Sequence, residues 1–298
     1  MINPTEKSLK ELSSMKTGGS TYECYFPENK NELVDIIKKF SDENKKYTVL
    51  GNMSNVLIPD NGLKVPVIIT TAMKETKVVS DENGAVKVYA ESGVSFTKFS
   101  FEMCKQGYSG LEFAYGIPGS VGGAVYMNAG AYGGEAKDVI TKVVACDKKG
   151  NIFEFTNQEC EFGYRTSKFT NDEYVIIGAE FALTKADADE CVANAKEIMQ
   201  KRVDKQPLEY PSCGSTFKRP EGYFAGKLIQ DSGLMGYSVG GAQVSEKHAG
   251  FVINRNGATT EDVLELMRQV RKIVTEKFGV TLEEEIKLLN EYGEVFKL

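Results

Sequence analysis

One stretch of the sequence decides how the fold is interpreted: residues 115–134, YGIPGSVGGAVYMNAGAYGG, which hold seven glycines and no charged side chain. A flexible linker would carry Ser, Lys or Glu where this stretch has Ile, Val, Met and Tyr. Small residues beside a flat apolar surface indicate that a large ligand lies against the main chain. The alternative is a tightly packed structural loop. The stretch matches neither GxGxxG nor GxxxxGK[ST], so it supports neither a Rossmann nor a P-loop site.

A second glycine-containing loop lies upstream, in residues 50–57, LGNMSNVL, directly after the strand-like run Tyr47–Leu50. Glycine allows the main chain to turn and to approach a ligand, while Asn and Ser supply short polar groups beside exposed amides. Such a loop suits a pyrophosphate. Taken alone, it is equally compatible with a simple turn between two strands.

Three further features carry polar side chains. Arg165 has a planar, permanently charged guanidinium that suits a carboxylate or a phosphate, although an isolated arginine is more often a solvated surface residue. Residues 213–220, CGSTFKRP, combine small residues, hydroxyls and two cations, as expected of an anion pocket. No histidine lies near Ser215 to activate it as a nucleophile, and the single histidine, His248, is expected to be structural.

The composition of the chain argues against several classes of protein. The 298 residues include 36 Lys and Arg against 42 Asp and Glu, and the net charge of −6 argues against a general nucleic-acid or membrane-surface binder. No window approaches ~18 consecutive apolar residues, so no membrane span is expected, and the first residues lack the pattern of a secretory signal. Six cysteines without a CxxC pair predict reduced thiols in a cytoplasmic protein that has neither a zinc site nor a disulfide framework.

The order of helical and strand patterns predicts an α+β fold, because it is too irregular for a βαβ series. A helix ends before Pro207 and a loop rich in Pro, Ser and Gly follows. We therefore expect an N-terminal domain over residues 1–200, with lobes of about 1–70 and 71–200, and a C-terminal domain over residues 201–298.

The C-terminal hundred residues predict one long helix and one strand. Apolar residues recur at helical spacing from Val263 to Val274, with Thr259 and Asp262 at the start and Gly279 at the end. A strand is expected over Thr281–Leu289.

Six motifs in this order resemble the UDP-N-acetylenolpyruvoylglucosamine reductase family, and the resemblance runs from residue 17 to the last residue. They are Gly51-Asn52-x-Ser54-Asn55-x-Leu57, Gly116-Ile117-Pro118-Gly119-Ser120-Val121-Gly122-Gly123, Asn128-Ala129-Gly130-Ala131-Tyr132-Gly133, Tyr164-Arg165-x-Ser167, Gly214-Ser215-x-Phe217 and Leu282-Glu283-x-Glu285. Each motif alone is weak, but six in register are highly specific.

The resemblance implies noncovalent FAD in a two-lobed domain of the vanillyl-alcohol-oxidase type, followed by a smaller α+β substrate-binding domain. By the same resemblance, the two glycine-containing loops hold FAD through Gly51, Asn52, Met53, Ser54, Asn55, Leu57, Gly116, Ile117, Pro118, Gly119, Ser120, Gly122, Gly123, Ala124, Asn128, Gly130, Ala131 and Tyr132. Candidate substrate contacts are Tyr164, Lys205, Lys218 and Arg219.

The implied reaction is the NADPH-dependent reduction of UDP-N-acetylglucosamine enolpyruvate to UDP-N-acetylmuramate in peptidoglycan precursor synthesis. NADPH reduces FAD, and a hydride then reaches the terminal carbon of the enolpyruvyl double bond. The resemblance assigns three catalytic residues: Arg165 stabilises the negative charge that develops, Glu285 polarises the enolate or holds a proton, and Ser215 protonates the α-carbon.

The chain departs from one branch of the family. The 98 residues after residue 200 are too few for the extra substrate loop of that branch, so the chain resembles the shorter, second type. Arg219 stands where that branch has asparagine, which implies different diphosphate contacts. The motif favours Glu285 over Glu284 as the catalytic acid. Strict alternation from Leu282 puts Glu284 on the apolar face and Glu285 opposite, and periodicity alone cannot choose between them.

Two other functions fit parts of the sequence. An oxidase or dehydrogenase acting on another sugar or alcohol would share the flavin domain, but residues 116–134 contain no His or Cys to tether FAD covalently. A non-catalytic nucleotide-binding protein would not need the three catalytic residues. The expected partner is a small-molecule substrate, with neither nucleic acid nor membrane, and the absence of a heptad or an exposed apolar stripe favours a monomer. No motif for the 2′-phosphate of NADPH is legible.

Overall fold

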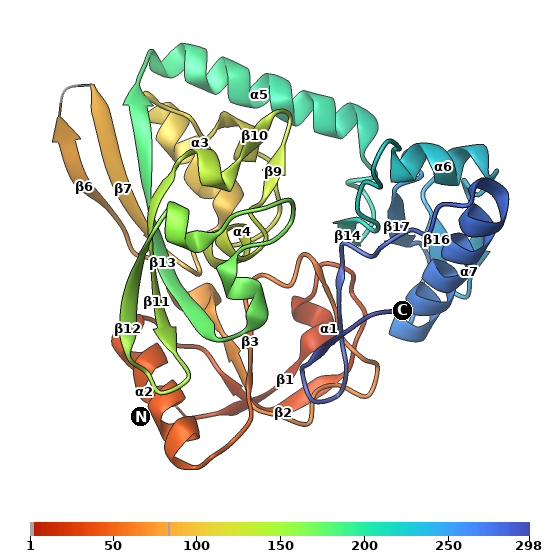
Figure 1. The fold of residues 1–298 in the computed structure, drawn as a ribbon, viewed down its shortest axis with the longest axis horizontal. Coiled ribbons are helices and arrows are strands. Elements are labelled where there is room, and N and C mark those ends of the chain that lie inside the picture. The colour runs from red at the N-terminus through yellow and green to blue at the C-terminus, as the bar shows by residue number, and fades with distance from the viewer. Residues whose placement is uncertain (1–2, 83) are drawn as a thin grey trace. The chain divides into compact units, whose positions relative to one another are not determined.

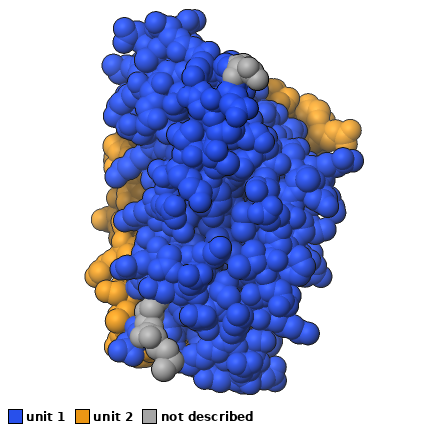
Figure 2. Space-filling model, turned by 90° about the vertical axis from the view of Figure 1, so that its left-hand side faces the viewer, with its two compact units in different colours: residues 1–3, 25–52, 68–201 blue, residues 4–24, 53–67, 202–298 orange. Residues whose placement is uncertain are grey.

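The computed structural model describes residues 3–82 and 84–298, which divide into two compact units (Figure 2). Of the described residues, unit 1 holds Asn3 and residues 25–52 and 68–201, and unit 2 holds residues 4–24, 53–67 and 202–298. The chain passes from unit 1 to unit 2 for the last time between Lys201 and Arg202, next to the boundary expected near residue 200. The sequence predicts one uninterrupted domain over residues 1–200, whereas residues 4–24 and 53–67 pack within unit 2.

Unit 1 is built on an antiparallel sheet with the strand order β12-β11-β13-β7-β6, and the short β8 also pairs with β13 (Figure 1). The strands are β6 (Thr76–Glu82), β7 (Ala85–Glu91), β8 (Tyr108–Ser109), β11 (Ile140–Asp147), β12 (Ile152–Thr156) and β13 (Tyr174–Lys185). Val175 and Ile177 of β13 belong to one apolar core. Ile176 and Phe181 belong to another. The central strand is therefore apolar on both faces, as expected of a strand buried on two sides.

Helices supply the other half of each core in unit 1. α2 (Lys30–Asp42) packs with Val175 and Ile177. α3 (Phe96–Lys105) and α4 (Val121–Tyr126) pack in the core that contains Ile176 and Phe181. The other strands with residues in unit 1 are β3 (Thr48–Leu50), β5 (Val67–Ile69), β9 (Gly130–Ala131) and β10 (Gly134–Glu135). The long helix α5 (Ala188–Lys205) begins in unit 1 and ends in unit 2.

Unit 2 is organised around α7 (Thr260–Phe278), whose buried face packs with Met15 and Leu57. Its antiparallel sheet has the strand order β14-β17-β16-β15, and a three-stranded sheet, β19-β18-β4, contains one parallel pair, β18 with β4. Its other elements are β1 (Thr5–Ser8), α1 (Leu9–Leu12), β2 (Ser20–Tyr25), β4 (Val56–Leu57), β14 (Ser212–Ser215), α6 (Ala225–Asp231), β15 (Ser238–Val239), β16 (Ala242–Val244), β17 (Phe251–Asn254), β18 (Lys287–Leu289) and β19 (Val295–Phe296). No helix within residues 3–82 and 84–298 has the length and apolar character needed to span a membrane.

Both ends of α7 lie where the sequence predicts them. Thr259 and Asp262 form a reciprocal capping box, and Gly279 ends the helix in the left-handed conformation with φ 68°. A long-range contact adds to the cap: the carboxylate of Asp60 accepts the main-chain N–H groups of Thr260 at 2.8 Å and Glu261 at 3.1 Å. Residues 53–67 therefore help to stabilise the main helix of unit 2.

The strand expected over Thr281–Leu289 is wrong for its first six residues. Only Lys287–Leu289 form a strand, β18. Residues 283–285 instead make single contacts with residues 216–218: Lys218 N donates to Glu283 O at 2.8 Å and Glu285 N donates to Thr216 O at 2.9 Å. Phe217 and Glu284 form an isolated bridge. The alternation of side chains persists without a continuous ladder, which is why the sequence pattern resembled a strand.

Replacing Asp60 by Ala should lower the free energy of unfolding by about 1 kcal/mol, because two N–H groups in the first turn of α7 lose their acceptor. Urea denaturation of the two proteins measures the difference. The matched control is Asp35→Ala, which removes an exposed carboxylate of α2. Equal losses in the two variants would show that Asp60 does not cap α7.

Candidate active site

Within unit 1, Gly51 at the start of the first glycine-containing loop lies beside Ser120 of the second. Gly51 follows β3, and Ser120 precedes α4. A Cβ atom added to Gly51 would lie 2.6 Å from the Ser120 hydroxyl, so a larger residue at this position would force that hydroxyl to move. The same hydroxyl accepts the N–H of Gly123 at 3.3 Å and caps α4. Gly51, the first residue of one predicted FAD segment, is thus a neighbour of the other predicted FAD segment within unit 1.

Residues 119–122 run alongside residues 92–96 and are fixed by main-chain hydrogen bonds. The bonds are Phe96 N to Gly119 O at 2.9 Å, Val121 N to Val94 O at 2.8 Å and Gly122 N to Ser92 O at 2.8 Å. Within the part of the chain that the structure describes, the N–H groups of Gly119 and Ser120 have no acceptor. Two consecutive N–H donors on a held main chain fit the pyrophosphate of FAD, because an anion is stabilised by fixed main-chain dipoles.

Several predicted site residues have a main chain that is unusual for an L-amino acid. Of the eight non-glycine residues with positive φ in the described ranges, four are candidate site residues: Met53 (φ 47°), Asn128 (φ 43°), Tyr132 (φ 52°) and Arg165 (φ 55°). This conformation costs free energy and persists where the surroundings enforce it, which is common at ligand sites.

Asn128 lies in the second loop, but its side chain is committed to the protein. The residue is 1% exposed. Its amide nitrogen donates to the Glu135 carboxylate at 2.8 Å and to Gly163 O at 2.9 Å, and its amide oxygen accepts from Lys137 N at 3.0 Å. Any contact of Asn128 with a cofactor is therefore made by its main chain. Its side chain holds the turn that carries Arg165.

Arg165 lies at the tip of a tight turn over residues 163–166. Gly163 N donates to Thr166 O at 3.0 Å, and the return bond is 3.4 Å. The guanidinium donates through Nη2 to Gly130 O at 3.1 Å and lies 5.3 Å from the centre of the Tyr164 ring. The structure thus places Arg165 against the predicted FAD loop, with Tyr164 beside it and exposed.

Ser215 is the last residue of β14 in unit 2 and lies opposite Phe251. The pairing of β14 with β17 shifts register between Ser212 and Ser215. Gly214 lies within this irregular stretch and adopts the positive φ of 75° that the turn of the main chain requires. The next residue, Thr216, is buried and fixed twice: its N–H donates to Gly250 O at 2.8 Å and its hydroxyl accepts from Val252 N at 2.9 Å. A glycine turn on one side and a buried threonine on the other hold the main chain of Ser215.

Glu285 is brought next to this strand end by main-chain pairing. Its N–H donates to Thr216 O at 2.9 Å, and its carbonyl accepts the side-chain amide of Asn55 at 3.2 Å. Asn55, predicted from the sequence to contact FAD, is therefore also a support for Glu285 within unit 2.

The three consecutive acids lie in different surroundings. The Glu283 side chain is 68% exposed and forms an ion pair with Lys218 at 3.5 Å. The Glu284 side chain is 8% exposed and forms an ion pair with Arg271 of α7. Side chains alternate between two faces of an extended chain, so Glu284 shares its face with buried Leu282 and Ile286. Nothing in the sequence marked Arg271 as the partner of Glu284, because the two meet only through the packing of α7.

The other candidate residues of unit 2 lie near its surface. Arg219 stacks over the Phe224 ring at 3.9 Å and donates through Nε to Tyr223 O at 3.3 Å. Lys205 is exposed at the end of α5. His248 accepts Gly250 N at 3.1 Å through Nδ1 and packs edge-on against Phe251. Burial lowers the pKa of His248, in line with the expected structural role.

Comparison with known proteins defines the class and then the family. Residues 24–156 match a family model described as FAD binding domain. Together with the paired glycine loops, this match defines an FAD-dependent oxidoreductase. Residues 206–289 match the model described as UDP-N-acetylenolpyruvoylglucosamine reductase, C-terminal domain. The chain is 46% identical to UDP-N-acetylenolpyruvoylglucosamine reductase of Oceanobacillus iheyensis, over 96% of the chain and 92% of the relative.

Two further relatives agree. The reductase of that name from Lachnoclostridium phytofermentans is 46% identical over 95% of the chain and 91% of its own length. The crystal structure of UDP-N-acetylenolpyruvylglucosamine reductase from Thermus caldophilus matches with a TM-score of 0.81 at 31% identity, covering 97% of the chain and 99% of that structure. The chain belongs to the UDP-N-acetylenolpyruvoylglucosamine reductase family. The expected α+β fold, with an FAD-binding part and a C-terminal domain of this family, is confirmed, and the cofactor is FAD.

Gly51→Ala should weaken FAD binding about tenfold, or ~1.4 kcal/mol, because the new methyl group displaces the Ser120 hydroxyl that caps α4. Titration of apoprotein with FAD, followed by flavin fluorescence, measures the affinity. Adding Ser120→Ala leaves only a 3.8 Å contact for the new methyl group. The double variant should therefore bind FAD as well as Ser120→Ala alone does. Unchanged affinity in Gly51→Ala would separate this loop from the FAD site.

Proposed function

We propose that Arg165, Ser215 and Glu285 carry out the chemistry of this enzyme. Its reaction is the NADPH-dependent reduction of UDP-N-acetylglucosamine enolpyruvate to UDP-N-acetylmuramate, a step of peptidoglycan precursor synthesis. One observation carries the assignment of residues: main-chain pairing puts Glu285 beside the strand end that holds Ser215, while its neighbour Glu284 is already paired with Arg271.

FAD, when bound, relays a hydride from NADPH to the terminal carbon of the enolpyruvyl double bond. Residues 51–57 and 116–132 hold the cofactor in this proposal. The N–H groups of Gly119 and Ser120 are the donors suited to its pyrophosphate, and the Gly51 main chain lies close enough to Ser120 to contact the same ligand.

Arg165 stabilises the charge that develops during the reduction. When a hydride adds to the terminal carbon, the electron pair of the double bond moves toward the α-carbon and its carboxylate. A guanidinium keeps its positive charge at every physiological pH and can bind a carboxylate through two N–H groups. The bond to Gly130 O holds it in place before the substrate arrives, so little reorganisation is needed at the moment of reaction.

Ser215 and Glu285 complete the addition. The hydroxyl hydrogen of Ser215 passes to the α-carbon, which forms the new C–H bond, and the serine oxygen then recovers a proton. A serine hydroxyl is a weak acid, so its geometry matters more than its acidity. The Gly214 turn and the buried Thr216 supply that geometry. Glu285 polarises the enolate or holds the proton that restores the serine.

The same proposal assigns substrate binding to Tyr164, Lys205, Lys218 and Arg219. Three of them are cations suited to the diphosphate of the substrate. Arg219 is pre-oriented by its stacking on Phe224, which reduces the side-chain entropy that binding would otherwise cost.

We further propose that the enzyme acts in the cytoplasm as a monomer. All six cysteines are buried thiols, and burial raises the pKa of Cys24 to about 11. All six stay free of disulfide bonds, which is typical of proteins in a reducing compartment. Light scattering after size-exclusion chromatography should give the monomer mass of 32.8 kDa, and a mass twice as large would refute the monomer.

Glu285→Gln should separate the two half-reactions in an anaerobic stopped-flow titration. We expect NADPH to bleach the visible flavin absorbance at the wild-type rate. Recovery of the absorbance on adding UDP-N-acetylglucosamine enolpyruvate should be slower by about 10³, because the carboxyl group no longer supports proton transfer.

Glu276→Gln is the control, since Glu276 is an exposed acid of unit 2 whose partner, Lys272, has no role in this proposal, and it should leave both rates unchanged. Loss of the second half-reaction in Glu284→Gln but not in Glu285→Gln would overturn the assignment. A wild-type protein whose reduced flavin does not recover with this substrate would overturn the function itself.

A further inference from the structure

We propose that Arg271 is a positioning residue for Glu285. It lies on α7, contacts neither Ser215 nor Glu285 in any described hydrogen bond, and holds the segment that leads into Glu285. The inference rests on the catalytic role proposed above for Glu285.

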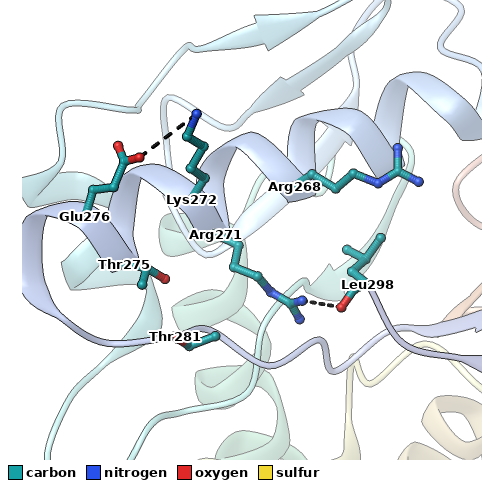
Figure 3. Close-up of a pocket in the computed structure, with 7 residues that line it drawn as sticks. All are labelled: Arg268, Arg271, Lys272, Thr275, Glu276, Thr281 and Leu298. Atoms are coloured by element: carbon teal, nitrogen blue, oxygen red, sulfur yellow. Dashed lines mark hydrogen bonds and ion pairs between the residues drawn. The ribbon is translucent and has the colours of Figure 1, made fainter.

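The guanidinium of Arg271 joins three parts of unit 2. Its Nε donates to Leu282 O at 2.9 Å, its Nη1 donates to Leu298 O at 2.5 Å, and its Nη2 pairs with the Glu284 carboxylate. Figure 3 shows the side chain reaching from α7 to Leu298. Arg271, Arg268 and Lys272 are among the residues that line a hollow of about 510 Å³ here. One side chain therefore ties the rigid helix to the residues on either side of Glu283.

Residues 281–286 need such an anchor because they have no continuous strand partner. The segment is fixed on one side by single bonds to residues 216–218 and by Asn55. On the side of α7, Arg271 makes the polar contacts described for Leu282 and Glu284. When one contact is removed, a segment held by a few separate contacts loses more of its positional stability than a strand paired continuously within a sheet.

The ion pair between Arg271 and Glu284 also determines to which face of the segment the side chains of Glu284 and Glu285 point. Glu284 lies on the same face as buried Leu282 and Ile286, so its carboxylate requires a buried partner. Because successive side chains point to opposite faces, holding Glu284 toward α7 directs Glu285 to the other face. Without Arg271, the segment would lose both this ion pair and the hydrogen bond to Leu282 O. The loss of the second contact would leave Glu285 free to shift even where Glu284 is replaced by an apolar residue.

A lysine cannot replace Arg271 fully. The guanidinium presents N–H groups in a planar fork and meets three oxygens at once, whereas an ammonium on a flexible stem acts as a point charge. We therefore expect Arg271→Lys to keep the neutralisation of Glu284 but to lose part of the positioning.

The experiment measures the two half-reactions separately in the holoenzyme. For Arg271→Met, flavin reduction by NADPH should stay within about twofold of the wild type. Flavin reoxidation by UDP-N-acetylglucosamine enolpyruvate should slow by about 10², the expected effect of a small displacement of a reacting group. The Arg271→Lys rate should fall between the two, and the KM for the enolpyruvyl substrate should change much less than kcat.

Arg268→Met is the matched control. Arg268 lies one turn earlier on α7 and pairs with Glu261 and Glu265, away from residues 282–285, so both half-reactions should be unchanged. The double variant Arg271→Met/Glu284→Met separates positioning from charge neutralisation. It removes the buried pair and should recover the thermal stability lost in Arg271→Met, but it should remain slow in reoxidation.

Wild-type reoxidation in the double variant would overturn the proposal, because Arg271 would then only neutralise Glu284. An equal fall of both half-reactions in Arg271→Met would also overturn it, since general destabilisation would explain the loss. Glu285→Gln, measured alongside, distinguishes the two levels of inference. If Glu285→Gln reoxidises normally, the proposed catalytic role fails. If only Glu285→Gln is slow, the catalytic role stands and the positioning role of Arg271 fails.

Discussion

The pairing of residues 55–57 with residues 285–288 is the constraint on which unit 2 depends. Asn55 makes two of the hydrogen bonds in this pairing. The Asn55 carbonyl accepts Lys287 N at 3.0 Å, and the Asn55 side chain donates to Glu285 O at 3.2 Å across a separation of 230 residues. The parallel pair β4 and β18 continues from it. The same stretch places Leu57 in the core beside α7 and brings Asp60 to the first turn of that helix. One segment, distant in sequence, thus supports both the central helix and the segment that carries Glu285.

Local chemistry explains which parts of the fold could be predicted from the sequence. The ends of α7 were predictable because Thr259, Asp262 and Gly279 act within one turn of the helix. The segment after α7 was predicted less well. Its alternation of apolar and polar residues is that of a strand, but residues 216–218 lie beyond the end of β14 and offer it only isolated contacts. Partners chosen by tertiary structure cannot be read from periodicity.

The candidate site divides in the same way. Its residue types and motifs were visible in the sequence, and the structure places Gly51 beside Ser120 and Glu285 beside the end of β14. The contacts that individual side chains make could not be predicted from the sequence. The Asn128 side chain serves the protein, and Arg271 carried no motif at all. Such roles arise from burial and long-range contact, so they follow only once the packing is known.

The division of the chain also has a consequence for how the protein is made. Residues 4–24 and 53–67 leave the ribosome early, yet they pack with residues 202–298, which are synthesised last. At ~5–20 residues per second, the nascent chain waits on the order of ten seconds between the second of these segments and its partners. During that time Met15 and Leu57, both buried in the core that contains α7, have no native core to enter. Unit 1 has its full sequence once residue 201 is made, whereas unit 2 must wait for the last segment of the chain.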